Sequence, residues 1–307
     1  MAKITLITAF FDIGRGNMNG SYLERNTNKY IEYFEFWAGI KNDLIIYTQK
    51  EYATRIFDIR EKKGMKDHTK IVVIDDIFKI EEKVFMRMKK IEENEDYINF
   101  RYIKSDISNR ADYNYIMMMK YWFLKDSVDR FQIDEFVAWF DFGFNHGGEV
   151  FNFSEDFNFK WNYDFEEKIN LFSLRNPDEV CGIESVQLFI DCIMGSPVVL
   201  PSKYANILWE HILTSAKALL LLDSIDDDQQ LLLMSYKMEP EIFKINKSDW
   251  FLPIKQFGNP NMRVRKIEKD NLITILRKTK YRFLLKSNFI KRCIKRINKF
   301  YSVFYDK

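Results

Sequence analysis

Short apolar runs alternate with segments of helical spacing in the first hundred residues of the chain. Three runs, over residues 4–10, 43–48 and 70–74, are rich in β-branched side chains and predict buried strands. Between the first two runs, aromatic side chains over residues 28–38 recur at helical spacing. This alternation of strand and helix favours an α/β fold with a largely parallel sheet.

The same pattern continues through the middle of the chain. Residues 113–128 place apolar side chains on one face of a helix, and we interpret the methionines among them as core packing. Residues 136–140 (FVAWF) are uniformly apolar, end at Asp141 and predict a buried strand. The other expected elements are helices over residues 81–95, 201–222 and 226–236, and strands over residues 166–174 and 185–193.

Composition excludes a disordered or collagen-like chain, because 47% of the 307 residues are apolar. The formal charge is only +2, but it is unevenly divided. Residues 263–307 hold 15 Lys and Arg against three acids, whereas the rest of the chain is acidic overall. We therefore predict a mildly acidic domain over residues 1–262 and a basic helical extension over residues 263–307.

The basic extension is amphipathic. If residues 290–304 form a helix, their apolar and cationic side chains fall on opposite faces. Helices of this kind lie in membrane interfaces, where each basic residue near an anionic leaflet contributes about 1 kcal/mol. We expect contact with an anionic membrane surface; the alternative is that the apolar face docks on the body or on another subunit. The acidic body and the lack of a binding motif argue against nucleic acid as a partner.

The expected compartment is the cytoplasm, with the protein peripheral on the inner face of the cytoplasmic membrane. Three cysteines at unrelated spacings make neither a disulfide framework nor a CxxC metal site. No segment approaches the roughly 18 apolar residues needed to span a bilayer. The apolar run at the N-terminus is too short for a secretory signal.

Asp141, in the segment WFDFGFNHGG, is the first candidate for chemistry. Ligands of open α/β sheets bind at the carboxyl ends of strands, and a carboxylate there can hold a divalent cation that neutralises a diphosphate. Mn²⁺ or Mg²⁺ would suit such an oxygen site, with His146 or a distant acid completing the shell. The alternative is that Asp141 only caps a turn.

The loop over residues 8–16 is the second candidate, because small residues at a strand end let a nucleotide approach the backbone. Neither a dinucleotide-binding motif nor a P-loop is present. In this loop Arg15 can meet a phosphate or remain solvated. Lys120, on the methionine-rich helix, can offset diphosphate charge or extend to solvent.

Three consecutive acids, Asp226, Asp227 and Asp228, precede Gln229 and an apolar segment. They suit a helix N-terminus. Alternatively, one carboxylate faces the crevice as a base for an acceptor hydroxyl or binds the acceptor. Among these side chains we predict Asp228 as the base and Asp227 and Gln229 as acceptor-binding residues, with Gly195 beside them.

Taken together, the motifs TAFFDIGRG, YNYIMMMKYWF, WFDFG and DDQQ resemble those of the bacterial HtrL/YibB (WlaTC-like) proteins. The resemblance covers about residues 1–250. These proteins look like glycosyltransferases of the GT-A fold, a mixed, mostly parallel sheet flanked by helices, and belong to lipopolysaccharide and capsule assembly.

What the resemblance implies is transfer of a hexose from a UDP-sugar donor to a glycan or glycolipid acceptor. Thr8, Ala9 and Phe10 would lie by the nucleotide, Asp141 would replace the first acid of the family's DxD motif, and Asp228 with Gln229 would lie near the acceptor. Gly143 stands where that motif has its second acid. The competing hypothesis is a non-catalytic accessory protein that binds a nucleotide or a glycan. Both inverting and retaining transfer remain open.

Overall fold

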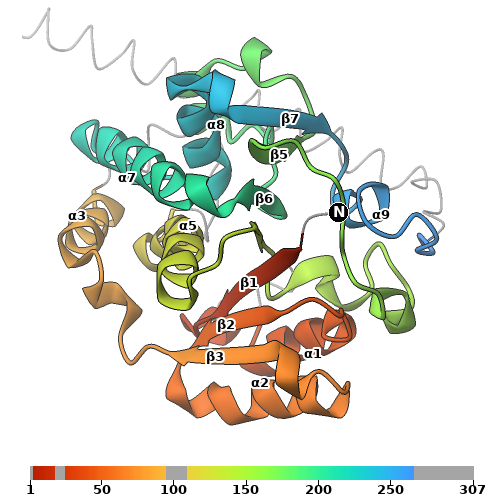
Figure 1. Ribbon diagram of the computed structural model, residues 1–307. Coiled ribbons are helices and arrows are strands. Elements are labelled where there is room, and N and C mark those ends of the chain that lie inside the picture. The colour runs from red at the N-terminus through yellow and green to blue at the C-terminus, as the bar shows by residue number, and fades with distance from the viewer. Residues whose placement is uncertain (1–2, 18–24, 95–108, 266–307) are drawn as a thin grey trace, which may run out of the picture.

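A seven-stranded sheet forms the centre of the computed structural model, which describes residues 3–17, 25–94 and 109–265 (Figure 1). Its strands lie in the order β3-β2-β1-β4-β6-β5-β7. Strand β6 is antiparallel to both of its neighbours, and every other pairing is parallel. The carboxyl ends of the parallel strands and the amino end of β6 therefore meet at one edge. The bounds are β1 Ile4–Phe10, β2 Leu44–Thr48, β3 Thr69–Val73, β4 Phe136–Trp139, β5 Ile169–Ser173, β6 Val198–Pro201 and β7 Phe243–Lys247.

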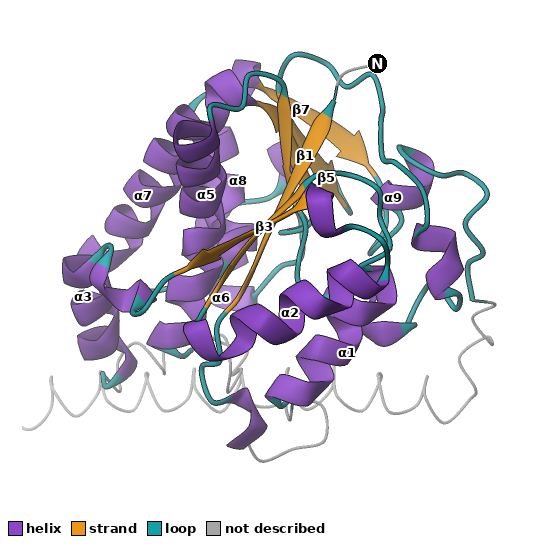
Figure 2. Cartoon of the chain, turned by 60° about the horizontal axis from the view of Figure 1, so that its bottom comes forward, coloured by secondary structure: helices purple, strands orange, loops and turns teal. Residues whose placement is uncertain are grey.

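Helices cover both faces of the sheet (Figure 2). Successive residues of a strand point to opposite faces, so in β1 Leu6 belongs to the core under α1 and α2, and Ile7 to the core under α3, α5, α7 and α8. Both side chains are fully buried. The bounds are α1 Thr27–Trp37, α2 Lys50–Lys62, α3 Glu82–Glu92, α5 Ala111–Phe131, α6 Gly182–Leu188, α7 Ala205–Leu221, α8 Asp228–Met238 and α9 Pro253–Gln256.

The fold class expected from the sequence, a mixed and mostly parallel sheet flanked by helices, is confirmed. One element was predicted wrongly: residues 185–193, expected as a strand, contain the end of α6 and then an irregular segment. The cause is that a short, mostly apolar run, interrupted here by Gln187 and Asp191, is compatible with a short helix as well as with a strand. Helix α2 and strands β6 and β7 were not anticipated.

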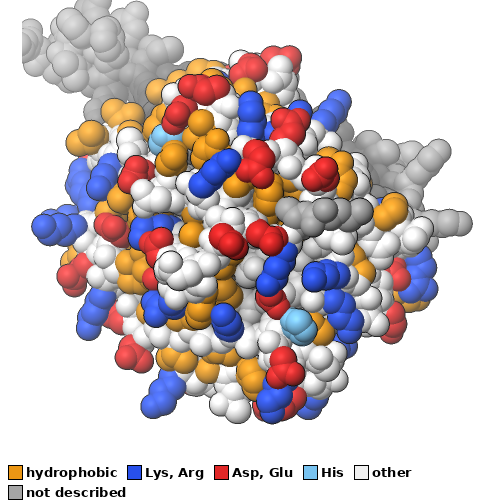
Figure 3. Space-filling view, in the orientation of Figure 1, with side chains coloured by type: hydrophobic (Ala, Val, Ile, Leu, Met, Phe, Trp, Pro, Cys, Tyr) orange, Lys and Arg blue, Asp and Glu red, His pale blue; other side chains and the backbone are white. Residues whose placement is uncertain are grey.

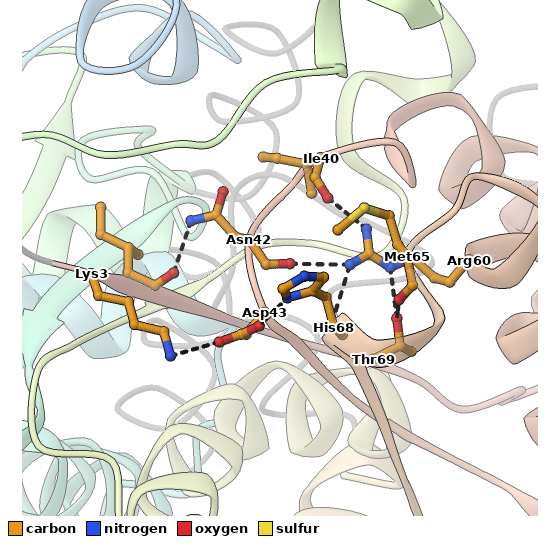
Figure 4. A network of polar contacts seen from close by, with 9 residues as sticks. Lys3, Ile40, Asn42, Asp43, Arg60, Met65, His68 and Thr69 are labelled. Atoms are coloured by element: carbon orange, nitrogen blue, oxygen red, sulfur yellow. Dashed lines mark hydrogen bonds and ion pairs between the residues drawn. The ribbon is translucent and has the colours of Figure 1, made fainter.

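Arg60 joins α2 to the amino-terminal edge of the sheet (Figure 4). Its guanidinium is fully buried and donates to the carbonyl oxygens of Ala38 and Ile40, both at 2.7 Å, and of Asn42 at 3.1 Å. Its Nε donates to Thr69 Oγ1 at 3.0 Å. Burial lowers the pKa of Arg60 to about 10. The side chain thus satisfies carbonyl groups that the turn after α1 leaves without partners.

The last described residues, 263–265, contact the segment between β4 and β5. Arg263 pairs with Asp156 at 2.7 Å, and Val264 forms an isolated bridge with Phe151. The amphipathic helix expected over residues 290–304, like nearly all of the basic extension, lies outside the described residues, and the boundary at residue 262 stays a prediction. None of the described helices is long and apolar enough to cross a membrane. Acidic and basic side chains are interspersed over the face seen in Figure 3.

Candidate functional site

A cavity of about 490 Å³ opens at the carboxyl ends of β1 and β4 and the amino end of β6. One wall comes from β1 and the loop after it, from α1 and from the loop after β4. The rest of the lining comes from α5, the turn before β6, the start of α8 and the loop after β7, whose Phe251 packs against Phe144 and His146 in the loop after β4. Charged and hydrogen-bonding residues of the lining are Asp12, Arg15, Arg25, Thr27, Tyr30, Tyr113, Lys120, Trp139, Asp141, His146, Glu149, Ser196, Asp228, Gln229 and Trp250.

Lys120 lies between two carboxylates at the base of the cavity. Its Nζ is 2.8 Å from Asp141 Oδ1 and 2.7 Å from Asp228 Oδ2. The side chains of Lys120 and Asp228 are almost fully buried, whereas that of Asp141 is 39% exposed. Trp139 Nε1 donates to the same oxygen of Asp141 at 2.7 Å. Asp141 is therefore held in place on one side and presented to the cavity on the other.

Lys120, Asp141 and Asp228 form a charged trio, and the charge of each depends on the other two. Burial works to lower the pKa of Lys120, but the carboxylates of Asp141 and Asp228 outweigh it and raise that pKa well above its usual value. Burial raises the pKa of Asp228, against the opposing effect of the Lys120 charge. Lys120 consequently stays protonated, and Asp228 is a stronger base than an ordinary aspartate.

The turn before β6 leaves space for the Asp228 carboxylate. A methyl group on Gly195 would place its carbon 1.8 Å from Asp228 Oδ2, so only glycine leaves space for the carboxylate. The next residue, Ser196, accepts a hydrogen bond at its Oγ from the backbone N–H of Asp141 at 2.9 Å. One short turn therefore contacts both acids of the trio.

Basic and aromatic side chains line the cavity near α1. Arg15 donates a hydrogen bond to the hydroxyl of Tyr30, and its guanidinium lies 5.7 Å from the ring centres of Tyr30 and Tyr113. Arg25 Nη1 lies 3.0 Å from His146 Nε2. Burial first, and the Arg25 charge second, lower the pKa of His146. An incoming anion therefore meets two arginines here and a mostly neutral imidazole.

A divalent cation could be held in this cavity through Asp141. Its Oδ1 is engaged by Lys120 and Trp139, while Oδ2 has no protein partner among the described residues. His146 has both ring nitrogens occupied, by Arg25 and by Glu149. No group of three or more His, Cys, Asp or Glu that could hold a metal ion occurs within the described ranges. The described residues therefore offer a cation one free carboxylate oxygen, at Asp141, and both the metal and the role expected for His146 stay predictions.

The surroundings of Gly143 leave little space for a second acid after Asp141. A Cβ there would lie 3.1 Å from Cε1 of the Tyr30 ring, which is closer than ordinary contact. Tyr30 in turn binds Arg15. The Tyr30 ring therefore takes up space that a carboxylate side chain at position 143 would need.

Most of the residues predicted from the sequence meet in this cavity. Its lining includes Ala9, Phe10, Arg15, Lys120, Asp141, His146, Gly195, Asp228 and Gln229. Thr8 and Asp227, expected at the nucleotide and at the acceptor, are not among the lining residues. Thr8 is buried inside β1, and the Asp227 side chain accepts from the Gln229 N–H as the N-cap of α8. For Asp227 the alternative interpretation, a helix cap, describes the observed contact.

Several lining residues were missed. The side chains beside Lys120 could have been predicted from the sequence. Lys120 follows Tyr113, Ile116 and Met117 by seven, four and three residues, which is the spacing of one helix face. Ser196 directly follows Gly195, which was predicted from the sequence. Arg25 and Trp250 carried no such signal, because loops position them.

The chain has clear relatives. Over residues 2–259 it matches the family model described as "Bacterial protein of unknown function (HtrL_YibB)". It is 29% identical over 267 residues to Protein HtrL of Escherichia coli (strain K12), which covers 81% of this chain and 90% of that protein. The crystal structure of apo mouse xyloside xylosyltransferase 1 matches with a TM-score of 0.39 and 8% identity, covering 80% of this chain and 85% of that one.

Proposed function

Since this chain belongs to the HtrL_YibB family, as its motifs predicted, we propose its function from the chemistry of the cavity. It is a glycosyltransferase that moves a hexose from a UDP-sugar to a hydroxyl of a lipid-linked, lipopolysaccharide or capsule glycan. The observation that carries this proposal is the contact of Lys120 with Asp141 and Asp228 inside the cavity at the strand ends.

The donor diphosphate lies near the basic side chains in this proposal. The lining holds three basic side chains, Arg15, Arg25 and Lys120, against four carboxylates. A diphosphate adds further negative charge, so Arg15 and Arg25 alone leave an excess of anions. A Mn²⁺ or Mg²⁺ ion held by Asp141 Oδ2 and the phosphate oxygens would supply the missing positive charge.

Asp228 is the base for the acceptor hydroxyl. Its raised pKa favours proton abstraction near neutral pH. Lys120 keeps the carboxylate ionised before the reaction and lies between it and Asp141, so it holds the two acids at a fixed separation. This role applies to inverting transfer; a retaining enzyme would not need a base at this position.

Calorimetric titration with UDP, with and without Mn²⁺, tests the donor site. Asp141→Ala should abolish the Mn²⁺-dependent part of binding, whereas Asp129→Ala, at an exposed pair on α5, should not change it. If UDP does not bind at all, the proposal is wrong. UDP binding without donor hydrolysis or transfer would instead favour a non-catalytic nucleotide- or glycan-binding accessory protein.

The proposed location is the cytoplasmic side of the cytoplasmic membrane, where a lipid-linked acceptor would be reached. The charge of residues 263–307 supports this location. Flotation with anionic liposomes tests it: removal of residues 279–307 should abolish flotation. Equal flotation of the truncated and full chains would contradict it.

A further inference from the structure

Leu221 and Leu222, at the end of α7, are the two most exposed large hydrophobic side chains of the described residues, at 86% and 72%. We call this pair the leucine tip. Lys217, four residues before Leu221, lies on the same exposed face of the helix. The preceding residues, Leu219 and Leu220, are buried in the core. The leucine tip therefore presents its apolar surface to the outside of the protein.

The backbone holds the leucine tip in place. Asp223, the next residue, has a φ of 51°, the left-handed conformation in which many helices end. The N–H groups of Asp223 and Ser224 donate to the carbonyl oxygens of Leu220 and Leu219, at 3.2 and 2.9 Å. These two hydrogen bonds make a Schellman motif, whose usual apolar contact joins the positions of Leu219 and Ser224. The end of the helix therefore does not require apolar side chains at the leucine tip.

The leucine tip lies at the same edge of the sheet as the cavity. Strand β6 runs away from the cavity, and α7 begins at Ala205, just after β6 ends at Pro201. The 17 residues of α7 span about 26 Å, which carries the chain back to the cavity edge. Asp228, in the cavity lining, then follows Leu222 by six residues.

Basic side chains of α3 lie beside the leucine tip (Figure 1). Arg87 pairs with Asp223 and so neutralises the acid that follows the tip. Lys83 and Lys90 are four residues before and three residues after Arg87, which places them on the same face of α3, and both are exposed. Within the described ranges, Lys83, Lys90 and Lys217 form no ion pair. The tip therefore has positively charged surroundings.

The other acids of α3 lie on different sides of that helix. At about 100° per residue, Glu82 and Glu93 are turned about 120–140° away from Arg87. Glu92 pairs with Lys89. In Figure 3, hydrophobic side chains at the end of α7 border Lys and Arg side chains over α3. This surface thus joins apolar and cationic side chains.

We propose that the leucine tip is a membrane contact site whose partner is an anionic lipid bilayer. The two leucine side chains enter the boundary between headgroups and acyl chains, and the lysines contact the headgroups. A stable protein–protein interface buries about 800 Å² on each partner, far more than two leucines offer. Contact here turns the cavity edge towards the lipid, so a lipid-linked acceptor reaches Asp228 directly from the bilayer. The contact itself goes beyond the proposed function and does not depend on it.

A fluorophore at the leucine tip tests the contact. In the full chain with Cys181→Ser and Cys293→Ser, Leu221→Cys is labelled with the environment-sensitive dye NBD; Cys192 is buried and does not react. Met238→Cys is the matched control label, since Met238 is also exposed, at 42%, but ends α8 at the opposite edge of the sheet. Vesicles of phosphatidylglycerol with phosphatidylcholine, or of phosphatidylcholine alone, are added, and flotation measures how much of the chain is bound.

We expect anionic vesicles to shift the NBD emission at position 221 to shorter wavelength, and doxyl-labelled lipid to quench it, while the label at position 238 stays unchanged. Leu222→Ser should weaken vesicle affinity about tenfold, whereas Met238→Ser should not change it. Lys83→Gln combined with Lys90→Gln should weaken binding about tenfold on anionic vesicles only.

The proposal is overturned if the label at position 221 responds no more than the label at position 238 while the chain floats, or if no vesicle binds the chain. NBD emission typical of a buried dye before lipid is added would also overturn it, because another part of the chain or a second copy then covers the tip. Failure of UDP to bind would overturn the proposed function and leave this contact site standing.

Discussion

Gly195 and Asp228 are in direct contact across the cavity floor, with no space for a side chain between them. In Gly195→Ala the new methyl carbon would lie 1.8 Å from Asp228 Oδ2, so the carboxylate must leave Lys120. We expect donor hydrolysis and transfer to fall at least about tenfold, and the free energy of unfolding to fall by about 1–3 kcal/mol. Steady-state kinetics and urea unfolding measure the two effects.

Gly182→Ala is the matched control, since nothing lies within 4 Å of a Cβ at that glycine. Its activity and stability should remain close to those of the native chain. Full activity of Gly195→Ala would contradict the proposal that Asp228 acts as the base from its observed position.

Lys120→Met tests the cation of the trio. The substitution leaves Asp141 and Asp228 facing one another without a positive charge, and losing one partner of a buried ion pair costs about 3–5 kcal/mol. We expect a lower midpoint of urea unfolding and no detectable transfer. Lys125→Met, on the same helix, removes only an exposed pair with Asp129 and should cost less than about 1 kcal/mol.

A double variant separates structure from chemistry. Lys120→Met with Asp228→Asn removes both charges of the most buried pair, so it should regain much of the lost stability but no activity. If the double variant were active, Asp228 would not be the base.

Arg60→Met tests the buried network at the other edge of the sheet. It leaves the carbonyls of Ala38, Ile40 and Asn42 without their donor, and each unsatisfied buried acceptor costs about 1–3 kcal/mol. We expect strong destabilisation and unaltered UDP affinity in whatever fraction remains folded. Arg55→Met, which loses only a contact with Asn28 at the surface, should be nearly neutral in chemical unfolding.

The Asp156–Arg263 pair predicts a specific pH dependence. Burial alone would raise the pKa of Asp156, but hydrogen bonds from Arg263 outweigh it and lower that pKa below 3.8. A lowered aspartate pKa stabilises the fold above the unfolded value and loses this effect as pH falls through the folded value. The melting temperature of Asp156→Asn should therefore be lower than that of the native chain at pH 6, and the gap should close below about pH 4. An equal gap at both pH values would contradict this assignment, and Glu167→Gln, at an exposed pair with Lys203, should show no gap.

The fold was readable from the sequence wherever a pattern was long or bounded by clear signals. Strand β1 and helix α5 have such patterns. Strand β7 was not seen, because FKINK is an edge strand with only Phe243 buried. Helix α2 buries Ile56, Ile59 and the charged Arg60, which is too few apolar positions to reveal an amphipathic stripe.

The three residues of the trio could be predicted one by one from the sequence, but their mutual contact could not. Lys120, Asp141 and Asp228 each had an interpretation of their own. Their contact spans up to 108 residues of chain and depends on how α5, β4 and α8 pack. Periodicity reports which face of an element is buried, and it carries no information on which distant side chains meet there.

The reversed direction of β6 has a consequence for how this family can diverge. Because β6 runs against its neighbours, its first residues arrive at the same edge as the last residues of β4. The cavity lining therefore comes from two separate stretches of the chain, residues 9–149 and residues 195–251. Recombination between relatives within the connecting segment would exchange the second set of lining residues, with Asp228, as one piece and leave Lys120 and Asp141 unchanged.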